Sequence, residues 1–409
     1  MAIFFTILLV LCVAGVAHTY LVYPWYVVKR AGARPWAGNQ LVPHAVWMPG
    51  NFAGRDATKD WPDVHVLMAA HNEEAVLERK LTTLADQDYP GKLHYYVGSD
   101  NSSDRTNQIL TDWANRDDRL RPTLFTSRQG KPSIINQLAI QAGTEGVYVL
   151  TDASVMLRPS TVRELVRPFL NDAKLALVDT TMVQTGGTAR GIGETETQYI
   201  DREVAIKRAE GKLWGAMIGP FGGCYALLAG AYRPVPDKFL VDDFYLCLSA
   251  YEQGYRGISS ATAIVEESVG QHLRDEFRRK VRISSGNWQN LIRFRNLWWP
   301  PWRNPLAFAF FSHKVLRWLT PFLLLIGGLA WVGLAVTTLN PYVLKSVAVV
   351  TAVMIGGVLL DAVLSQLGIH VRALRKLRYF LAMNLALLVG FYRYLTGISS
   401  NVWQPSNRN

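Results

Sequence analysis

The sequence is short of charged residues and of cysteine. Charged residues make up 18% of its 409 residues, against about 25% in typical soluble domains, so particular segments must lack charge. Cys12, Cys224 and Cys247 lie far apart without a CxxC pair, which excludes a disulfide framework or a zinc site and fits a reducing compartment. The chain also has no GxxxxGK[ST] motif, and no GxGxxG follows its first predicted strand. A P-loop and a dinucleotide-binding fold therefore lose their main support.

The missing charge is concentrated in long apolar runs near both ends. No Asp, Glu, Lys or Arg occurs between Ala2 and Val28 or between Leu319 and Leu344, and each run is long enough to cross a bilayer as a helix. A secretory signal peptide is the alternative for the first run, but that run lacks a basic start and exceeds a typical signal core in length. We predict about four transmembrane helices, at residues 1–28, 319–339, 342–365 and 378–396.

Basic residues beside these runs predict the orientation of the chain. They follow the first run and fill the segment 372–378 before the last, and the positive-inside rule places both in the cytoplasm. The middle of the chain would then be cytoplasmic at the cell (inner) membrane, with 29–60 as a linker and the tail, 397–409, outside. Residues 301–318 mix aromatic with basic residues and predict a helix lying in the membrane interface, unless they begin the next span.

The middle of the chain, residues 61–300, has the alternating pattern of an α/β domain. Apolar strands at Val64–Ala70, Leu93–Gly98 and Gly146–Thr151 alternate with helical stretches, as in a mostly parallel sheet covered on both faces. In such sheets, ligands bind beyond the carboxyl ends of the strands. The net charge of +11 is compatible with nucleic acid, an anionic membrane surface or a phosphorylated substrate as partner.

Polar residues follow three of these strands. Asn72 and Glu73 come after the first strand, Asp100 after the second and Asp152 after the strand VYVLT. A single aspartate in this position is usually a turn former or a helix cap. Two aspartates at the ends of strands in one sheet are harder to explain in that way, and they indicate a binding site.

Six short motifs in a fixed order give the chain a family resemblance. They are HNEE (71–74), SDNSSDRT (99–106), GKP (130–132), TDAS (151–154), VDD (241–243) and RKVRI (279–283). The ordered set resembles the membrane-embedded family-2 glycosyltransferases, the group that includes cellulose, chitin, hyaluronan and poly-N-acetylglucosamine synthases. In that group aspartate sites precede a Gln-(Gln/Arg)-x-Arg-Trp motif, and the 35 residues between Asp243 and Arg279 match its spacing. The resemblance implies a cytoplasmic α/β domain of GT-A type that binds a UDP-sugar.

The resemblance implies how the nucleotide and its metal would be held. Asp100 would read the uracil base, with Asn72 and Glu73 lining the same pocket. Asp152 resembles the first member of the Asp-x-Asp pair that holds Mg²⁺ or Mn²⁺ on the donor diphosphate. The second member is Ser154, a neutral hydroxyl, so we expect metal binding to depend more on the diphosphate itself.

Basic residues would neutralise the diphosphate as it leaves. Lys131 resembles the lysine of the family's Gly-Lys segment, and Pro132 at the first helical turn leaves free N–H groups that favour phosphate. A plain helix start with a solvated lysine is the alternative. Lys280 and Arg282 align with the basic positions of the last motif.

The resemblance also implies a catalytic base and an acceptor site. Asp243 resembles the base, and the positive end of the helix it opens would help to keep it ionised, although Asp242 and Asp243 could also simply cap that helix. Ile283 replaces the motif tryptophan under the acceptor, and Trp288 is a candidate substitute. The glycine-rich run 219–230 resembles the family's acceptor segment, although it could also be a plain turn before the strand CYALLA. The predicted acceptor residues are Phe221, Gly222, Gly223, Cys224, Asp242 and Trp288.

These implications favour an inverting β-glycosyltransferase that adds a sugar from a UDP-sugar to a growing polysaccharide, coupled to translocation across the membrane. The alternative is a glycolipid-forming enzyme similar to the ceramide glucosyltransferases, which also depart from Asp-x-Asp at its last position. The expected partners are the UDP-sugar, a carbohydrate or lipid acceptor and membrane lipids, without nucleic acid. A membrane scaffold or transporter fits less well, because the predicted spans are few and the carboxylates lie in the α/β domain.

Overall fold

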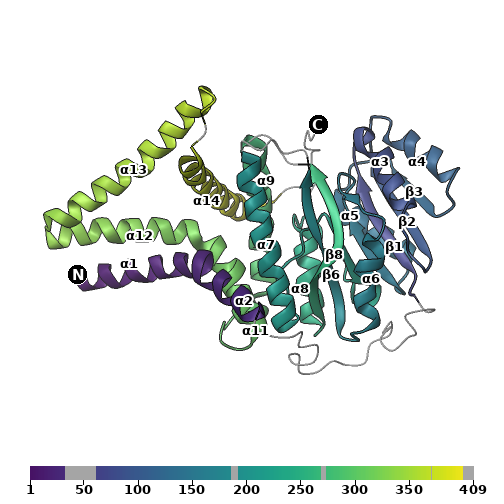
Figure 1. The fold of residues 1–409 in the computed structure, drawn as a ribbon, viewed down its shortest axis with the longest axis horizontal. Coiled ribbons are helices and arrows are strands. Elements are labelled where there is room, and N and C mark those ends of the chain that lie inside the picture. Colours follow the sequence, from purple (N-terminus) through teal and green to yellow (C-terminus); the bar gives the residue numbers. More distant parts are fainter. Residues whose placement is uncertain (33–60, 186–191, 269–272, 370, 399–409) are drawn as a thin grey trace.

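The chain folds into an α/β domain and a group of long helices that extends to one side of it (Figure 1). The computed structural model describes residues 1–32, 61–185, 192–268, 273–369 and 371–398. Most of the predicted linker, 29–60, and of the predicted tail, 397–409, therefore lies outside the described residues.

One eight-stranded sheet forms the centre of the described α/β domain, in the order β3-β2-β1-β4-β7-β6-β8-β5. The strands are β1 (Val64–Ala70), β2 (Leu93–Asp100), β3 (Leu120–Phe125), β4 (Val147–Thr151), β5 (Met156–Leu157), β6 (Leu175–Thr185), β7 (Cys224–Leu228) and β8 (Arg256–Ser268). The first four pair in parallel, as their alternation with helices predicts. β7 pairs antiparallel with both β4 and β6, so the complete sheet is mixed.

Helices pack against this sheet and bury it. They are α3 (Glu74–Ala85), α4 (Thr106–Ala114), α5 (Lys131–Ala142), α6 (Thr161–Val166), α7 (Ile192–Trp214) and α8 (Asp242–Glu252). Two further helices, α9 (Leu273–Arg293) and α10 (Arg295–Trp298), pack against α8 and against helices near the C-terminus. All seven residues of β1 are buried. A strand covered on both faces needs apolar residues at successive positions instead of alternation, which is why Val64–Ala70 reads as a continuous apolar run.

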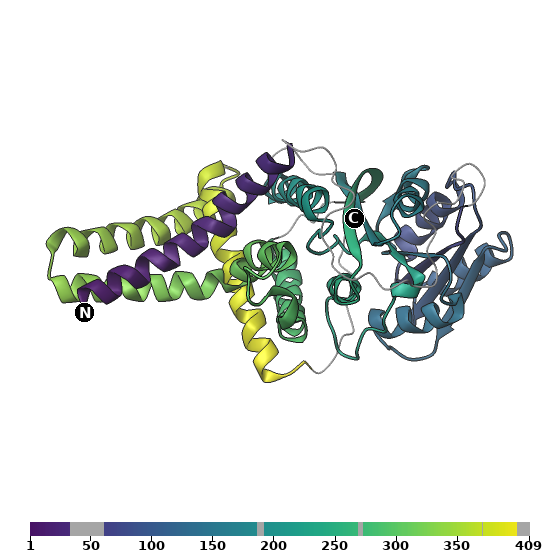
Figure 2. The same ribbon diagram turned by 90° about the horizontal axis from the view of Figure 1, so that it is seen from below.

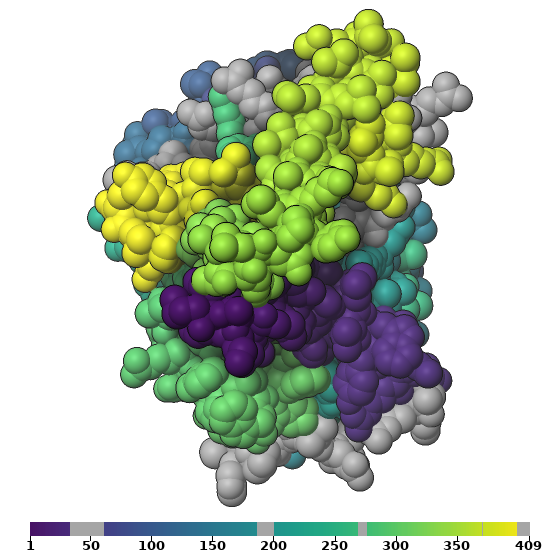
Figure 3. Space-filling view, turned by 90° about the vertical axis from the view of Figure 1, so that its left-hand side faces the viewer, coloured from purple at the N-terminus to yellow at the C-terminus, as the bar shows by residue number. Residues whose placement is uncertain are grey.

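Three helices among the described residues are long and apolar enough to cross a membrane. They are Ala2–Gly32, Pro305–Thr338 and Pro341–Gln366, built from α1 (Ala2–Ala17) with α2 (Tyr23–Gly32), from α11 (Pro305–Phe310) with α12 (Leu316–Thr338), and from α13 (Pro341–Gln366). The first, in purple, lies against α12 (Figure 3). Ile3, Leu329 and Val353 are examples of the large apolar side chains that these helices leave exposed.

The fourth predicted span differs from these three. It falls in α14 (Arg372–Thr396), which is not among the helices that qualify as spans. It lies across the other long helices (Figure 2) and packs along α9 of the α/β domain. There Ser284 Oγ donates to Leu387 O at 2.9 Å, and Ser285 Oγ donates to Gly390 O at 3.0 Å. The described structure thus has three candidate spans, which roughly matches the predicted count of about four, and α14 carries basic residues at its start and packs one side against α9.

The segment 301–318, predicted as a separate interface helix, belongs largely to the second span. Helix starts at Pro305, where Asn304 caps it by accepting a hydrogen bond from Ala307 N–H at 2.8 Å. It continues through a π-helical turn, Phe311–Val315, into α12 without a break. The alternative prediction, an early start of the next span, describes this segment better.

Candidate active site

Carboxylates and one lysine meet at the edge of the sheet where the parallel strands end. Asp152 follows β4, Lys131 opens α5 and Asp242 opens α8. Lys131 Nζ lies 2.7 Å from Asp152 Oδ1 and 3.7 Å from Asp242 Oδ2. Burial disfavours the charge on Lys131, but the surrounding carboxylates outweigh this effect and raise its pKa. The structure therefore brings together residues that the sequence assigned to the donor and acceptor sides.

Asp243 lies next to this group and has an unusual protonation equilibrium. Burial and repulsion from Asp242 raise the pKa of Asp243 to about 7, and attraction to Lys131 opposes the rise. A carboxylate whose pKa is near the working pH is well suited to general-base catalysis. The geometry of Asp243 is compatible with the role predicted from the sequence.

The turn Phe221–Gly223 joins Asp243 to Asp152. Gly222 has a φ of +79°, and a Cβ at this position would collide with Asp243 Oδ2. Only glycine combines this backbone conformation with so close an approach. The next carbonyl, of Gly223, accepts a hydrogen bond from Asp152 N–H at 2.9 Å. Phe221 and Gly222 are partly exposed, so a ligand can reach this turn.

Two basic residues of the last motif differ in what they contact. Arg282 of α9 donates from Nη1 to Leu240 O at 3.1 Å. Burial lowers the pKa of Arg282, and the three site aspartates oppose this effect, so the guanidinium lies within their electrostatic field. Lys280 pairs with Glu276, with 3.8 Å between Nζ and Oε1. Arg282 thus belongs to the carboxylate cluster, and the contact described for Lys280 lies along its own helix.

Asp100, predicted to read the nucleotide base, holds a loop of the protein. It is fully buried at the end of β2. Its Oδ1 accepts the Gln129 N–H at 2.6 Å, and its Oδ2 accepts the Gly130 N–H at 3.1 Å. Arg128 Nε also donates to Oδ2, at 3.1 Å. Asp100 therefore positions the loop that leads into Lys131.

Asn72 and Glu73 connect the end of β1 to the following loop. Asn72 Oδ1 accepts a hydrogen bond from Ser103 N–H at 2.9 Å. Glu73 N–H donates to Thr106 Oγ1 at 2.9 Å. Both side chains are partly exposed at the same sheet edge as Asp100, which leaves them accessible to a ligand.

The predicted metal ligands lie in one tight turn after β4. Asp152 O accepts a hydrogen bond from Val155 N–H at 3.3 Å, so Ser154 lies within this turn. The Asp152 side chain is 40% exposed and Ser154 is partly exposed. In the described part of the chain, no group of three or more His, Cys, Asp or Glu side chains could hold a metal ion. The protein alone offers one carboxylate and one hydroxyl here.

Two predicted acceptor residues belong to the protein core. Cys224 is 0% exposed in β7, where it pairs with Thr151. Trp288 packs against Phe391 and Phe322, with ring centroids 4.6 and 6.0 Å apart. The Trp288 side chain joins α9 to α14 and α12, and its assignment to the acceptor site stays a prediction. A motif shows that a residue is near a site, but the packing of its helix decides where its side chain points.

Lys80 is a residue that sequence analysis missed. It is 0% exposed on α3, and its Nζ donates to Thr151 Oγ1 at 2.8 Å and to Val155 O at 2.5 Å. The ammonium thus lies beneath the turn that carries Asp152, and burial lowers its pKa to about 8. A signal was present in the sequence, because Lys80 interrupts the apolar stripe of Leu77, Leu81 and Leu84, all buried.

The mixed sheet with acidic residues at its strand ends defines a GT-A type fold, and a solved structure shares it. The mannosyltransferase PcManGT from Pyrobaculum calidifontis, in complex with GDP-Man and Mn²⁺, superposes with a TM-score of 0.67 at 22% identity, covering 95% of this chain and 99% of that one. Residues 65–225 match the family described as Glycosyl transferase family 2, and residues 146–395 match Glycosyl transferase family group 2. The chain belongs to this glycosyltransferase family.

Curated relatives differ in what their names say they make. An N-acetylglucosaminyltransferase of Rhizobium meliloti is 25% identical over 374 residues, which cover 85% of this chain and 82% of that protein. A beta-monoglucosyldiacylglycerol synthase of Synechocystis is 33% identical over 293 residues, or 67% of this chain and 58% of the relative. The chain spans only 55% to 59% of the length of three relatives, including that synthase.

Proposed function

We propose that this family-2 glycosyltransferase moves a sugar from a UDP-sugar to an acceptor hydroxyl with inversion. Asp243 removes the proton of the acceptor hydroxyl, whose oxygen attacks the anomeric carbon as the bond to the diphosphate breaks and UDP leaves. The observation that carries the proposal is Asp243 itself, with its pKa raised to about 7 and its carboxylate against the accessible turn at Gly222. A base of this kind typically contributes about 10²- to 10⁴-fold to a rate.

Cations of the same cluster stabilise the leaving group. Lys131 pairs with Asp152 and lies near Asp242, and Arg282 lies within the electrostatic field of the site carboxylates. Preorganised charges of this kind act where negative charge develops. Lys280 belongs to the same basic motif. The nucleotide pocket is formed in part by Asp100, which holds the loop that leads into Lys131. Asn72 and Glu73 contribute the partly exposed surface beside it.

The turn after β4 fits a hard divalent cation, Mg²⁺ or Mn²⁺, which Asp152 and Ser154 would hold together with the donor diphosphate. Asp152 offers a partly exposed carboxylate and Ser154 a hydroxyl, and Mg²⁺ is commonly bound through one or two carboxylates together with substrate phosphates. When bound, such an ion neutralises charge on the departing UDP. Lys131, which pairs with Asp152 Oδ1, holds part of that carboxylate in place.

The position of the site favours an acceptor presented by the membrane. Phe244, the residue after Asp243, packs against Phe310 and Trp318 of the second span, with centroid separations of 5.6 and 5.5 Å. The reacting hydroxyl would then lie close to where this helix leaves the α/β domain. We place the α/β domain in the cytoplasm at the inner membrane, as the basic residues beside the spans predict.

Two observations favour a membrane lipid over a polysaccharide as acceptor. Ile283 replaces the motif tryptophan, and its candidate substitute, Trp288, packs against Phe391 in a helix interface. The relative named beta-monoglucosyldiacylglycerol synthase has 33% identity over two thirds of this chain, above the 25% of the Rhizobium meliloti enzyme. The sequence by itself favoured the polysaccharide, so the experiment must separate the two products.

Product size is the deciding measurement. The full chain in lipid nanodiscs would be incubated with each member of a panel of radiolabelled UDP-sugars, with GDP-mannose included as a different nucleotide. We expect label from one UDP-sugar in a lipid extract that migrates as a monoglycosylated lipid. Label in long, water-soluble polymer would support the polysaccharide, and label from GDP-mannose alone would overturn the UDP assignment.

Cysteine labelling tests the orientation. Thr338→Cys is at the last residue of α12, just before the turn to α13, and Gly397→Cys follows α14; both positions are exposed. If α14 stays on the side of the α/β domain, an impermeant reagent added to intact cells labels Thr338→Cys and leaves Gly397→Cys unmodified. Labelling of both would restore the fourth span predicted from the sequence.

A further inference from the structure

The turn at Phe221 rests on a buried ion pair that has no part in the proposed chemistry. Lys207 of α7 and Asp179 of β6 have side chains 2% and 0% exposed, with Nζ 2.5 Å from Oδ2. Removing two charges from water can cost as much as their attraction returns, so a buried pair is weak evidence for a role in stability. Its contacts with the turn indicate another reason for its presence.

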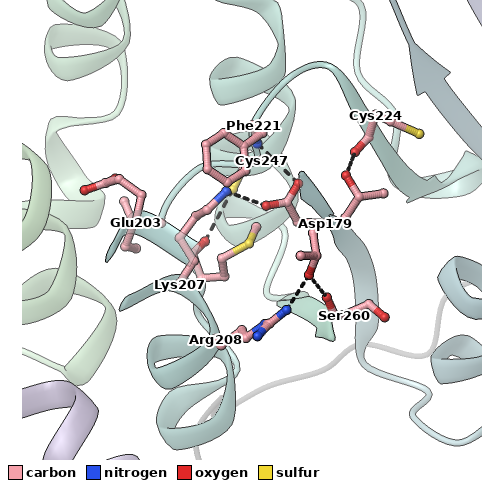
Figure 4. Close-up of polar contacts among 12 residues, drawn as sticks. Asp179, Glu203, Lys207, Arg208, Phe221, Cys224, Cys247 and Ser260 are labelled. Carbon is pink, nitrogen blue, oxygen red and sulfur yellow. Dashed lines mark hydrogen bonds and ion pairs between the residues drawn. The ribbon is translucent and has the colours of Figure 1, made fainter. Parts of the chain in front are cut away.

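The two members of the pair hold the backbone and the ring of the same residue. Asp179 Oδ1 accepts a hydrogen bond from Phe221 N–H at 3.2 Å. Lys207 Nζ lies 3.4 Å from the centroid of the Phe221 ring. Figure 4 shows Lys207 reaching from its helix to both partners. A cation over an aromatic face is attracted most strongly where water is excluded, as it is around this nearly buried ammonium.

Helix α7 also holds the segment that leads into the turn. Glu210, three residues after Lys207, accepts a hydrogen bond on Oε2 from Ile218 N–H at 3.0 Å. Residues three apart on a helix lie on one side of it, so a single helix face fixes residues 218 and 221. The chain then passes Asp243 at Gly222.

We propose that Lys207 and Asp179 are positioning residues, which place the Phe221–Gly223 turn against Asp243 and so set where the acceptor hydroxyl meets its base. The inference rests on the proposed function, because it needs Asp243 as the base. A misplacement of about 1 Å by a group outside the chemistry can lower a rate about 100-fold. The pair acts on acceptor transfer, because its contacts are with the turn and not with Lys131 or the loop at Asp100.

The test uses the full chain in nanodiscs and separates transfer from nucleotide binding. Lys207→Met with Asp179→Asn removes both charges together, and the Asn oxygen can still accept the Phe221 N–H. We expect kcat for transfer to fall at least about tenfold while the affinity for UDP stays within about twofold of wild type. Lys207→Arg keeps a cation over the ring and should recover most of the rate in an otherwise unchanged chain.

A matched control removes another buried ion pair. Asp361 and Arg378 link α13 to α14, with 3.1 Å between Oδ2 and Nη1 and the aspartate 2% exposed. Asp361→Asn with Arg378→Gln should leave kcat within about twofold. If the first double variant does not fold, Phe221→Leu tests the positioning role instead. It removes the ring that Lys207 contacts and keeps the backbone N–H that Asp179 accepts. It should show the same loss of kcat with unchanged UDP affinity.

The outcomes separate this inference from the function on which it rests. Wild-type kcat in both the double variant and Phe221→Leu would overturn the positioning role, as would a parallel loss of kcat and UDP affinity. In either case the wild-type enzyme still transfers sugar, so the proposed function survives. A wild-type chain that turns over no nucleotide sugar would instead remove the proposed function, and this inference with it.

Discussion

Two clusters of buried charge in this protein use similar side chains and differ in how completely the charges are paired. The site cluster lies at the sheet edge and comprises Lys131, Asp152, Asp242, Asp243 and Arg282. The junction cluster lies where α7 meets the first two candidate spans and comprises Tyr23, Glu203, Glu210, His313, Lys314 and Arg317.

Every carboxylate of the junction cluster has several donors. Glu203 Oε2 lies 2.8 Å from Lys314 Nζ and 3.1 Å from His313 Nε2, and Arg317 contacts Oε1. Burial alone would raise the pKa of Glu203, but these cations hold it well below its usual range. Glu210 Oε1 accepts the Tyr23 hydroxyl at 2.7 Å. Both glutamates are thus paired with several groups of the protein itself, so the junction cluster joins structural elements.

The site cluster shows the opposite shift. Asp243 is surrounded by other aspartates and by one nearby lysine, and its pKa rises to about 7. Asp152 remains 40% exposed. The comparison teaches that burial of charge alone does not mark an active site. The informative features are incomplete pairing, an accessible surface and a carboxylate whose pKa moves toward neutrality.

The largest effect is expected at Asp243. Asp243→Asn should lower kcat for sugar transfer by about 10³-fold, because an amide cannot accept the acceptor's proton, while UDP affinity stays within a few-fold of wild type. Glu252→Gln, on the same helix but in an exposed pair with Arg293, serves as the control and should keep its activity. Turnover in Asp243→Asn would remove this residue from the mechanism.

A substitution in the junction cluster should lower the stability of the protein instead of its activity. Glu203→Ala leaves His313, Lys314 and Arg317 without this partner, and loss of one member of a buried pair typically costs about 3–5 kcal/mol of unfolding free energy. Denaturant unfolding in detergent measures this cost, with Glu78→Ala, at an exposed position, as control.

The stabilisation by Glu203 also depends on pH. Because the folded pKa of Glu203 is lowered, its stabilisation is present above the unfolded pKa of about 4.3 and is lost as the pH falls below it. A variant as stable as wild type would show that this cluster does not contribute to the free energy of unfolding.

A pH profile sharpens the contrast between the clusters. The base must be deprotonated, so kcat/KM should fall as the pH drops below about 7, the pKa of Asp243. Asp242→Asn removes the neighbouring negative charge and should lower the pKa of Asp243, which moves the acid limb down by about one pH unit. Glu203→Ala should leave this limb in place. If the acid limb of the kcat/KM profile does not move in Asp242→Asn, the titrating group is not Asp243.

The smallest effect concerns the metal. Ser154→Asp adds an anionic oxygen beside Asp152 and should lower the Mg²⁺ or Mn²⁺ concentration for half-maximal activity by about two- to tenfold at fixed UDP-sugar. Asp152→Asn should raise it. Full wild-type activity after complete chelation, with no response to Ser154→Asp, would leave Lys131, Lys280 and Arg282 to neutralise the charge without an ion.

Local pattern was sufficient to predict the elements that carry the proposed chemistry. The apolar run Val64–Ala70 is β1, Asp152 follows a strand, and Asp243 lies in the first turn of a helix. Each of these features depends on neighbours in the chain, namely apolar residues at the right period and a polar residue at the end of an element. The three candidate spans were likewise visible as uncharged runs, since a bilayer imposes its length on the sequence.

Tertiary packing decided what remained. Whether the basic and apolar run at 372–396 crosses a membrane or lies along α9, and whether Trp288 faces a sugar or Phe391, depends on which helix faces meet. The pair of Lys207 and Asp179, the buried Lys80 and the pKa of Asp243 arise from contacts between residues distant in sequence. Sequence by itself determined which residues could act, because residue type and local period are local properties. Only the folded chain determined which of them meet, because burial and pairing are properties of neighbours in space.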